Sequence, residues 1–272
     1  MEEQDVKQCC ATFYGSDFAR LLLGDSFHPG GTQLTERLGN LLALTRDSQV
    51  LDVASGRGTS AFHLAESFGC KVTGVDLSEE NVRLATAEAS QRGLAGQINF
   101  QLDDAERLPF GDETFDAIIC ECAFCTFPSK PVAAQEFFRV LKPGGQLGLS
   151  DLTRTEATIP ELEGLLSWIA CVGDALPADR YVAILQQAGF EVPNIEDHND
   201  SLVEMVRQIQ AKLLGAEIVA GLKKIDLHGV DFTTGKQFAQ AALQATRSGA
   251  LGYVVIAARK PQYAFPLPTI IL

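Results

Sequence analysis

Short apolar segments alternate with helical segments along most of this 272-residue chain. The expected strands are residues 50–53, 71–75, 98–101, 115–119, 146–150, 190–195 and 252–260. Between them, apolar residues recur at helical spacing in segments 60–68, 79–91, 132–141, 178–188, 201–222 and 234–248. Strands that alternate with helices indicate βαβ units, and hence a parallel sheet covered by helices on both faces. We therefore predict an α/β fold with a doubly wound, Rossmann-like sheet.

Three segments organise the chain around this sheet. Residues 1–48 are expected to form an N-terminal helical or lid segment, because leucines recur at helical spacing between residues 34 and 42. Residues 49–260 form the predicted α/β domain, with a helical insertion at about 198–250 before the last strand. Residues 261–272 form a tail that could pack on the body or on a partner chain. The oligomeric state cannot be predicted from these features.

Charge and cysteine content exclude several classes of protein. Lysine and arginine number 22 against 35 acidic residues, so the net charge of −13 disfavours a nucleic-acid partner. No apolar stretch reaches the roughly 18 residues that a membrane-spanning helix needs. The N-terminus lacks the basic and apolar regions of a secretory signal, and the cysteine count of seven is odd. We therefore expect reduced thiols in a cytoplasmic protein without a membrane partner.

A glycine-containing turn follows the first expected strand. Asp52 lies in this strand, and Gly56 and Gly58 allow the backbone of the turn to come close to a ligand. Asp76 ends the second strand, where a carboxylate can accept hydrogen bonds from both hydroxyls of a ribose. These features also fit a dinucleotide enzyme, and a glycine-rich turn alone can serve only tight packing.

Further motifs narrow the choice. Asp104 and Ala105 follow the third strand, Asp116 opens the fourth, and Leu-Lys-Pro-Gly-Gly occupies residues 141–145. With the turn and Asp76, this set resembles the class I S-adenosylmethionine-dependent methyltransferases in order from about residue 49 to 151. The resemblance implies a methyltransferase sheet, S-adenosylmethionine as the cofactor, and a small-molecule substrate. The cofactor-binding residues that it implies are Asp52, Ser55, Gly56, Gly58, Asp76, Leu77, Asp104, Ala105 and Cys120.

One residue of the turn departs from the family. Ala54 stands where the family usually has glycine, and its methyl group could narrow the loop without blocking the cofactor.

Cysteines gather where the acceptor is expected. Cys120, Cys122 and Cys125 follow the fourth strand, whose carboxyl end faces the transferable methyl group in this fold, and Cys171 lies after the fifth strand. Buried core thiols are one interpretation of these residues. A zinc site is another, but no second pair or histidine has the spacing of a zinc finger. No metal ion is therefore predicted.

The cysteine positions resemble those of the arsenite methyltransferases. Cys122 precedes Phe-Pro-Ser-Lys at residues 127–130, and Cys171 precedes Gly173. The resemblance implies that Cys122 and Cys171 are catalytic and bind trivalent arsenic as thiolates, with Cys125 or the Cys9–Cys10 pair as the third donor. Sulfur donors suit this soft element and leave its lone pair free to attack a methyl group.

Two alternatives stay open. The first is C-, O- or N-methylation of an organic metabolite, such as a quinone or sterol-like ring, in an apolar pocket walled by the insertion. In that case His28 or Tyr14 would be the polar substrate-binding group. The second is a non-catalytic cofactor-binding protein. Sulfurs that face the cofactor would favour arsenic, whereas sulfurs turned into the core would favour the organic acceptor.

Overall fold

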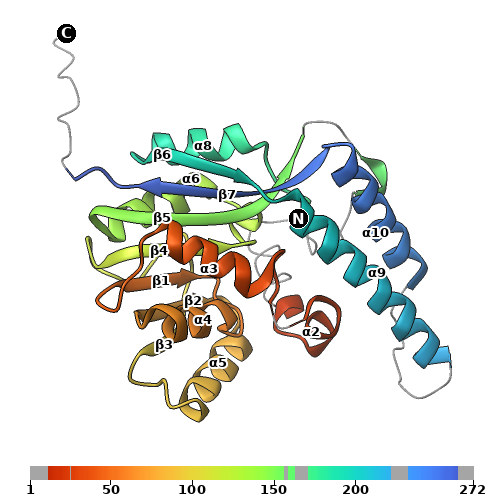
Figure 1. Cartoon of the computed structure of the whole chain (residues 1–272), viewed down its shortest axis with the longest axis horizontal. Coiled ribbons are helices and arrows are strands. Elements are labelled where there is room, and N and C mark those ends of the chain that lie inside the picture. Colours follow the sequence, from red (N-terminus) through yellow and green to blue (C-terminus); the bar gives the residue numbers. More distant parts are fainter. Residues whose placement is uncertain (1–11, 25, 156–158, 163–170, 222–231, 263–272) are drawn as a thin grey trace, which may run out of the picture.

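The computed structural model describes residues 12–24, 26–155, 159–162, 171–221 and 232–262. Within these residues, one seven-stranded sheet has the order β3-β2-β1-β4-β5-β7-β6 (Figure 1). Its strands are β1 (Gln49–Val53), β2 (Lys71–Asp76), β3 (Ile98–Leu102), β4 (Phe115–Glu121), β5 (Leu141–Arg154), β6 (Glu191–Asp197) and β7 (Leu251–Arg259). Every expected strand is present, and the predicted fold class is confirmed.

Helices connect these strands as the apolar spacing predicted. They are α3 (Gly31–Leu41), α4 (Thr59–Phe68), α5 (Glu79–Gln91), α6 (Lys130–Val140), α8 (Ala178–Gln187), α9 (Asn199–Gly221) and α10 (Phe232–Arg247). Three short helical elements were not predicted: α2 (Asp17–Leu23), η1 (Phe124–Thr126) and η2 (Pro160–Leu162). Their lengths of seven, three and three residues are too short to give a periodic apolar pattern.

The central strands are buried on both faces. Val50 packs in a cluster with residues of α4 and α5, whereas its neighbour Leu51 packs in a second cluster with residues of α6 and α8. Ile118 and Ile119 of β4 divide between the two clusters in the same way. Successive strand residues point to opposite faces, so this alternation requires helices on both sides of the sheet.

The last strand departs from the parallel arrangement. β7 is antiparallel to both β5 and β6, and its first residue Leu251 pairs with Arg154 at the carboxyl end of β5. The chain leaves β6 at this edge, and α9 and α10 pack against each other as a pair (Figure 1). Because the helix pair returns the chain to the edge that it left, β7 must run in the opposite direction.

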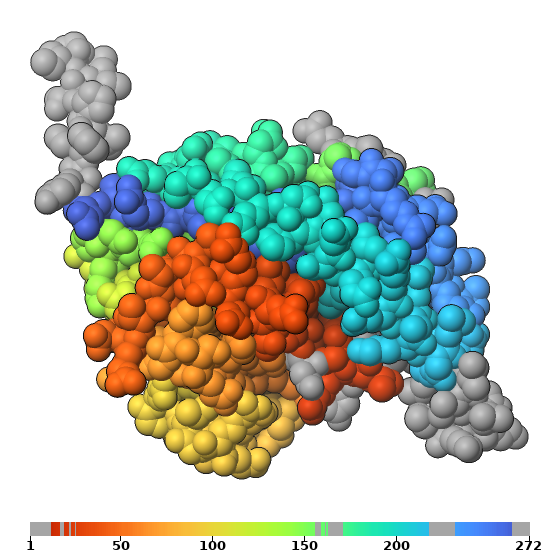
Figure 2. Space-filling view, viewed as in Figure 1, coloured from red at the N-terminus to blue at the C-terminus, as the bar shows by residue number. Residues whose placement is uncertain are grey.

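The strand order reverses between β1 and β4. β2 and β3 continue the sheet on one side of β1, whereas β5, β7 and β6 continue it beyond β4. In open α/β sheets, ligands bind in the crevice at the carboxyl ends of the strands at such a reversal. The space-filling view shows α9 (cyan) beside the N-terminal segment (red), and α2 of that segment contacts α9 (Figure 2).

Candidate active site

The turn between β1 and α4 is held by left-handed backbone. Ala54, Gly56 and Gly58 have φ values of 57°, 55° and 84°. A Cβ at Gly58 would lie 2.5 Å from Cζ of Phe100, so this position needs glycine for packing as well as for its backbone. The turn therefore places a run of backbone amides at the carboxyl end of β1.

Ala54 is strained where the family usually has glycine. A left-handed backbone costs an L-residue about 1–2 kcal/mol, and glycine avoids this cost. The greater conformational freedom of glycine in the unfolded chain cancels part of the stability gained by the substitution. We expect Ala54→Gly to raise the free energy of unfolding by up to about 1 kcal/mol, measured by thermal denaturation. Ala87→Gly, in the exposed face of α5, is the matched control and should lower it. A destabilised Ala54→Gly variant would contradict the strain argument.

Asp76 joins the turn to β2. Its Oδ2 accepts a hydrogen bond from the Gly56 amide at 2.8 Å, and its Oδ1 accepts one from the Ser78 amide at 2.8 Å. The side-chain amide of Asn81 also donates to Oδ1, at 3.3 Å. Burial raises the pKa of Asp76, and these donors partly offset the effect. The carboxylate is thus held at the end of the strand, as the sequence predicted.

Several buried polar atoms near the turn have no hydrogen-bond partner among the residues that the structure describes. They are Oδ2 of Asp52, Oγ of Ser55 and Oδ1 of Asn81. The pKa of Asp52 is raised well above its usual value by burial, then by Glu121 and Asp76. Unpaired buried oxygens cost free energy, so a ligand with donors and a positive charge would fit here.

Glu121 is a site residue that sequence reasoning missed. Its side chain is 4% exposed, and its Oε2 accepts hydrogen bonds from Ser60 Oγ at 2.5 Å and Thr35 Oγ1 at 3.0 Å. Nε2 of His28 lies 3.6 Å from the same oxygen. The only signal for Glu121 in the sequence is its place directly after the apolar residues of β4. We interpreted this segment through the neighbouring cysteines instead.

Two cavities meet at this edge of the sheet. The strand-end cavity lies over the ends of β2, β3 and β4, and the loop cavity lies under the β1–α4 turn. Both are lined by Phe27, Ala54, Gly56 and Glu121. Predicted site residues in the strand-end cavity are Tyr14, Gly56, Asp76, Leu77, Asp104, Ala105 and Cys122; those in the loop cavity are His28, Asp52, Ser55 and Gly56.

Some predicted residues do not line these cavities. Cys120 is fully buried in β4, so the geometry does not support its predicted contact with the cofactor. Gly58 packs on Phe100 and provides room for the turn without lining a cavity itself. His28 lies in the loop cavity beside Glu121, not in the strand-end cavity with Tyr14.

Three of the predicted thiols come together at the wall of the strand-end cavity. Cys122 lines the cavity, whereas Cys125 and Cys171 are buried behind it. The Cys171 thiol donates a hydrogen bond to the backbone carbonyl of Cys122 at 3.5 Å, and its Sγ lies 3.0 Å from the hydroxyl of Tyr14. The structure therefore brings Cys122 and Cys171 into contact.

A preformed metal site is not found in the part of the chain that the structure describes. There, no group of three or more histidine, cysteine, aspartate or glutamate side chains could hold a metal ion. Cys9 and Cys10, the predicted alternative third donors, lie outside the described residues. No helix among residues 12–262 with described placement is long and apolar enough to cross a membrane.

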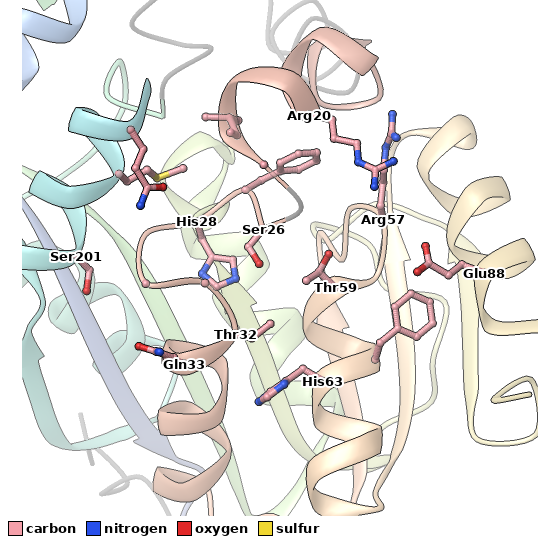
Figure 3. Close-up of a pocket in the computed structure, with 18 of the residues that line it drawn as sticks. Arg20, Ser26, His28, Thr32, Gln33, Arg57, Thr59, His63, Glu88 and Ser201 are labelled. Atoms are coloured by element: carbon pink, nitrogen blue, oxygen red, sulfur yellow. The ribbon is translucent and has the colours of Figure 1, made fainter. Parts of the chain in front are cut away.

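An outer cleft opens beside the loop cavity (Figure 3). Its volume is about 1180 Å³, and Ser26, His28, Arg57 and Thr59 line both spaces. On the α9 side, the labelled Ser201 joins Asp200, Glu204 and Gln208. This face of α9 is mainly polar, so the outer cleft is not the apolar pocket expected against the insertion; the cavity with an apolar lining there lies at Ile159, Phe238, Ala241 and Ala245.

Comparison with known proteins decides the family. A family described as a methyltransferase domain matches residues 50–145. The O-methyltransferase rstn1 of Aspergillus nomiae is 30% identical over 65% of this chain and 79% of its own length. The chain belongs to the class I S-adenosylmethionine-dependent methyltransferases.

Two further proteins share most of the length of this methyltransferase. The 27-O-demethylrifamycin SV methyltransferase of Amycolatopsis mediterranei is 29% identical over 85% of this chain and 84% of its own. The crystal structure of a putative sarcosine dimethylglycine methyltransferase from Galdieria sulphuraria superposes with a TM-score of 0.78. That likeness covers 92% of this chain and 98% of the other at 20% identity, so it supports the fold alone.

The cofactor of this methyltransferase is S-adenosylmethionine, and the site fits it. The molecule carries a positive sulfonium, an ammonium group and ribose hydroxyls. The unpaired Asp52 oxygen, the Glu121 carboxylate and Asp76 offer negative or accepting groups at the two joined cavities. When bound, it supplies an electrophilic methyl group for transfer to a small-molecule acceptor.

Proposed function

We propose that this methyltransferase methylates a hydroxyl oxygen of a small organic metabolite bound beside Tyr14 and Cys122. One observation carries the proposal: around Tyr14, the strand-end cavity is lined by Phe27, Ala123 and Phe127. An apolar, aromatic wall around one phenol suits an organic ring that presents a single polar atom. The two curated relatives described above are named O-methyltransferase rstn1 and 27-O-demethylrifamycin SV methyltransferase, and these names support an oxygen as the acceptor atom.

The cofactor would lie across the two joined cavities. Asp76 would accept hydrogen bonds from the ribose hydroxyls, and Asp104 with Ala105 would meet the adenine in the strand-end cavity. Asp52 and Glu121 would face the ammonium and sulfonium charges from the loop cavity. With the cofactor oriented in this way, the protein's main task is to position the acceptor in line with the methyl group.

The acceptor class is tested by supplying the purified protein with tritium-labelled S-adenosylmethionine and a panel of acceptors. The panel contains phenols, alcohols, amines and arsenite with glutathione, and each reaction is scored by labelled product and by S-adenosylhomocysteine. We expect hydroxyl compounds to be methylated and amines of the same skeleton to be inactive. Transfer confined to amines, or no transfer to any hydroxyl compound while the cofactor binds, would overturn the proposal.

Trivalent arsenic is the second candidate acceptor because Cys122, Cys125 and Cys171 gather beside the strand-end cavity. In this case Cys122→Ser and Cys171→Ser should each abolish methylation of arsenite. Cys70→Ser is the matched control, because Cys70 does not line the cavity and its thiol donates to the Leu64 carbonyl, which serine can also do. Undiminished arsenite methylation in both variants would exclude a thiolate-held acceptor.

A further inference from the structure

We propose that Glu121, positioned by Thr35 and Ser60, makes the cofactor site prefer S-adenosylmethionine over its product S-adenosylhomocysteine. The inference rests on the cofactor arrangement of the proposed function and does not depend on the acceptor. The two molecules share their adenosine, ammonium and carboxylate groups. They differ in charge only at the sulfur, which is a sulfonium in the first and a neutral thioether in the second.

The first support is the place of Glu121 between the two joined cavities. Asp76 and Asp104, which would meet the adenosine, line the strand-end cavity alone, and Asp52 lines the loop cavity alone. Within the described part of the chain, Glu121 is the only acidic residue that lines both. The sulfur joins the adenosine to the amino-acid chain of the cofactor, so residues shared by the two cavities are the ones that would face it.

The second support is the way in which the carboxylate is held. Ser60 Oγ of α4 and Thr35 Oγ1 of α3 donate to Oε2 of Glu121, at 2.5 Å and 3.0 Å. Oε1 has a longer contact with Thr35 alone among the described residues, at 3.3 Å. The two hydroxyls thus orient the carboxylate through one oxygen, and the other oxygen keeps acceptor capacity for a ligand. Because both donors are neutral, they leave its negative charge in place.

Positive side chains do not cancel this charge through a close ion pair. Among the described residues, no lysine or arginine lies within ion-pair distance of Glu121, and Nε2 of His28 is 3.6 Å from Oε2. This distance is longer than a hydrogen bond, and Nδ1 of the same ring lies 3.3 Å from the Pro29 carbonyl. Arg57 lines the loop cavity, but its guanidinium donates to the Gly15 carbonyl at 3.1 Å. The carboxylate is therefore available to a cation in the shared space.

The third support is the surroundings of the carboxylate. The side chain of Glu121 is 4% exposed, so little water screens its attraction for a cation. Phe27 also lines both cavities, and its Cδ2 would lie 3.7 Å from a Cβ at Gly56. An aromatic ring attracts a cation more strongly than a neutral group of the same shape. Both side chains that face the shared space thus favour a positively charged sulfur.

Glu121 would in this way hold the cofactor more strongly before methyl transfer than after it. Its attraction depends on the positive charge of the sulfur, which methyl transfer removes. The contacts of Asp52 and Asp76 depend on the ammonium and the ribose, which the product keeps. The difference between reactant and product therefore falls on Glu121, and it favours exchange of the product for a new cofactor molecule.

Calorimetric titration with S-adenosylmethionine and with S-adenosylhomocysteine tests this selection without any acceptor. We expect Glu121→Gln to weaken binding of S-adenosylmethionine by roughly 10- to 100-fold and that of S-adenosylhomocysteine by less than about threefold. The amide still accepts the two hydroxyl hydrogen bonds, so the substitution removes mainly the charge. A merely structural role would weaken both ligands by the same factor. An unchanged ratio of the two dissociation constants in Glu121→Gln overturns the proposal.

Two variants that remove other negative charges are the matched controls. Asp52→Asn removes a carboxylate that would face the ammonium of both ligands, so it should weaken both and leave their ratio unchanged. Asp179→Asn removes an exposed charge in the first turn of α8 and should leave both affinities unchanged. A fall of the ratio in either control as large as in Glu121→Gln would assign the selection to another charge and overturn the role of Glu121.

Thr35→Val and Ser60→Ala test the positioning of the carboxylate and do not depend on the stability of Glu121→Gln. Each removes one donor to Oε2, so each should lower the preference for S-adenosylmethionine by a smaller factor than Glu121→Gln does. Glu121→Gln combined with Thr35→Val should lose no more of the preference than Glu121→Gln alone, because both act through one carboxylate. A preference unchanged in Thr35→Val and in Ser60→Ala overturns their positioning role.

The outcomes separate this inference from the proposed function. A panel of acceptors without any hydroxyl product overturns the hydroxyl acceptor, whereas the ratio of the two affinities still decides the role of Glu121. An unchanged ratio in Glu121→Gln, together with methylated hydroxyl compounds, overturns the charge selection and leaves the hydroxyl acceptor in place.

Discussion

Replacement of Asp76 by alanine is expected to weaken binding of S-adenosylmethionine by about 100-fold. The carboxylate joins the β1–α4 turn to β2 through the Gly56 amide, and in the proposed binding mode it also accepts the ribose hydroxyls. Hydrogen bonds to a charged group contribute about 1.5–3 kcal/mol each, so loss of one to the ligand corresponds to about ten- to a hundredfold. The freed Gly56 amide would also lose its partner and loosen the turn.

Calorimetric titration of the purified variants measures this effect. Asp76→Asn keeps one acceptor oxygen and should fall between the wild type and Asp76→Ala. Asp179→Ala, an exposed position in the first turn of α8, is the matched control and should bind as the wild type does. Wild-type affinity in Asp76→Ala would show that the cofactor does not lie over the end of β2.

Much of the fold could be predicted because it depends on local apolar patterns. Every strand from β1 to β7 coincides with an expected strand, and βαβ alternation required a covered parallel sheet. The reversed direction of β7 could not be predicted in this way. It depends on the packing of α9 against α10, which decides the edge at which the chain re-enters the sheet.

A residue of the candidate site could be predicted from the sequence where its position at the end of a strand is enough to place it there. Asp52, Gly56 and Asp76 follow from the ends of β1 and β2, because any ligand at this edge meets them. Glu121 could not be recognised, since its importance comes from Thr35 and Ser60, which lie far from it in the sequence.

The thiols show the same limit. The resemblance to the arsenite methyltransferases implied that Cys122 and Cys171 belong to one site, but it carried no information on which sulfur is exposed. Only the packing shows that Cys122 lines the cavity and that Cys171 lies behind it against Tyr14. The choice between an arsenic acceptor and an organic acceptor depends on that difference.

The stability contributed by Asp151 is expected to fall by about 2.5 kcal/mol between pH 5 and pH 8. This carboxyl is fully buried, and burial raises its pKa to about 7 from an ordinary value of 3.8. The folded state therefore holds the proton more tightly than the unfolded chain. Its contribution is fully present below the unfolded pKa and is lost as the pH rises through the folded value.

Asp151→Asn isolates this effect because the amide resembles the protonated carboxyl and does not titrate. We expect the difference in unfolding free energy between wild type and variant to change by about 2.5 kcal/mol between pH 5 and pH 8. This change corresponds to a shift of roughly 5–10 °C in Tm. Thermal denaturation at several pH values measures it. A constant difference between the two proteins would show that Asp151 is ionised throughout.

The same measurement examines the charge of the thiol cluster. Cys171 raises the pKa of Asp151 through its negative charge, after burial and against the hydrogen bond from the Cys125 thiol. The lowered pKa of Cys171 adds stability as the pH rises, which is opposite in sign to the effect of Asp151. In a Cys171→Ser background, the pH at which the Asp151 contribution is lost should therefore shift downward. An unshifted loss would mean that Cys171 is a neutral thiol at these pH values.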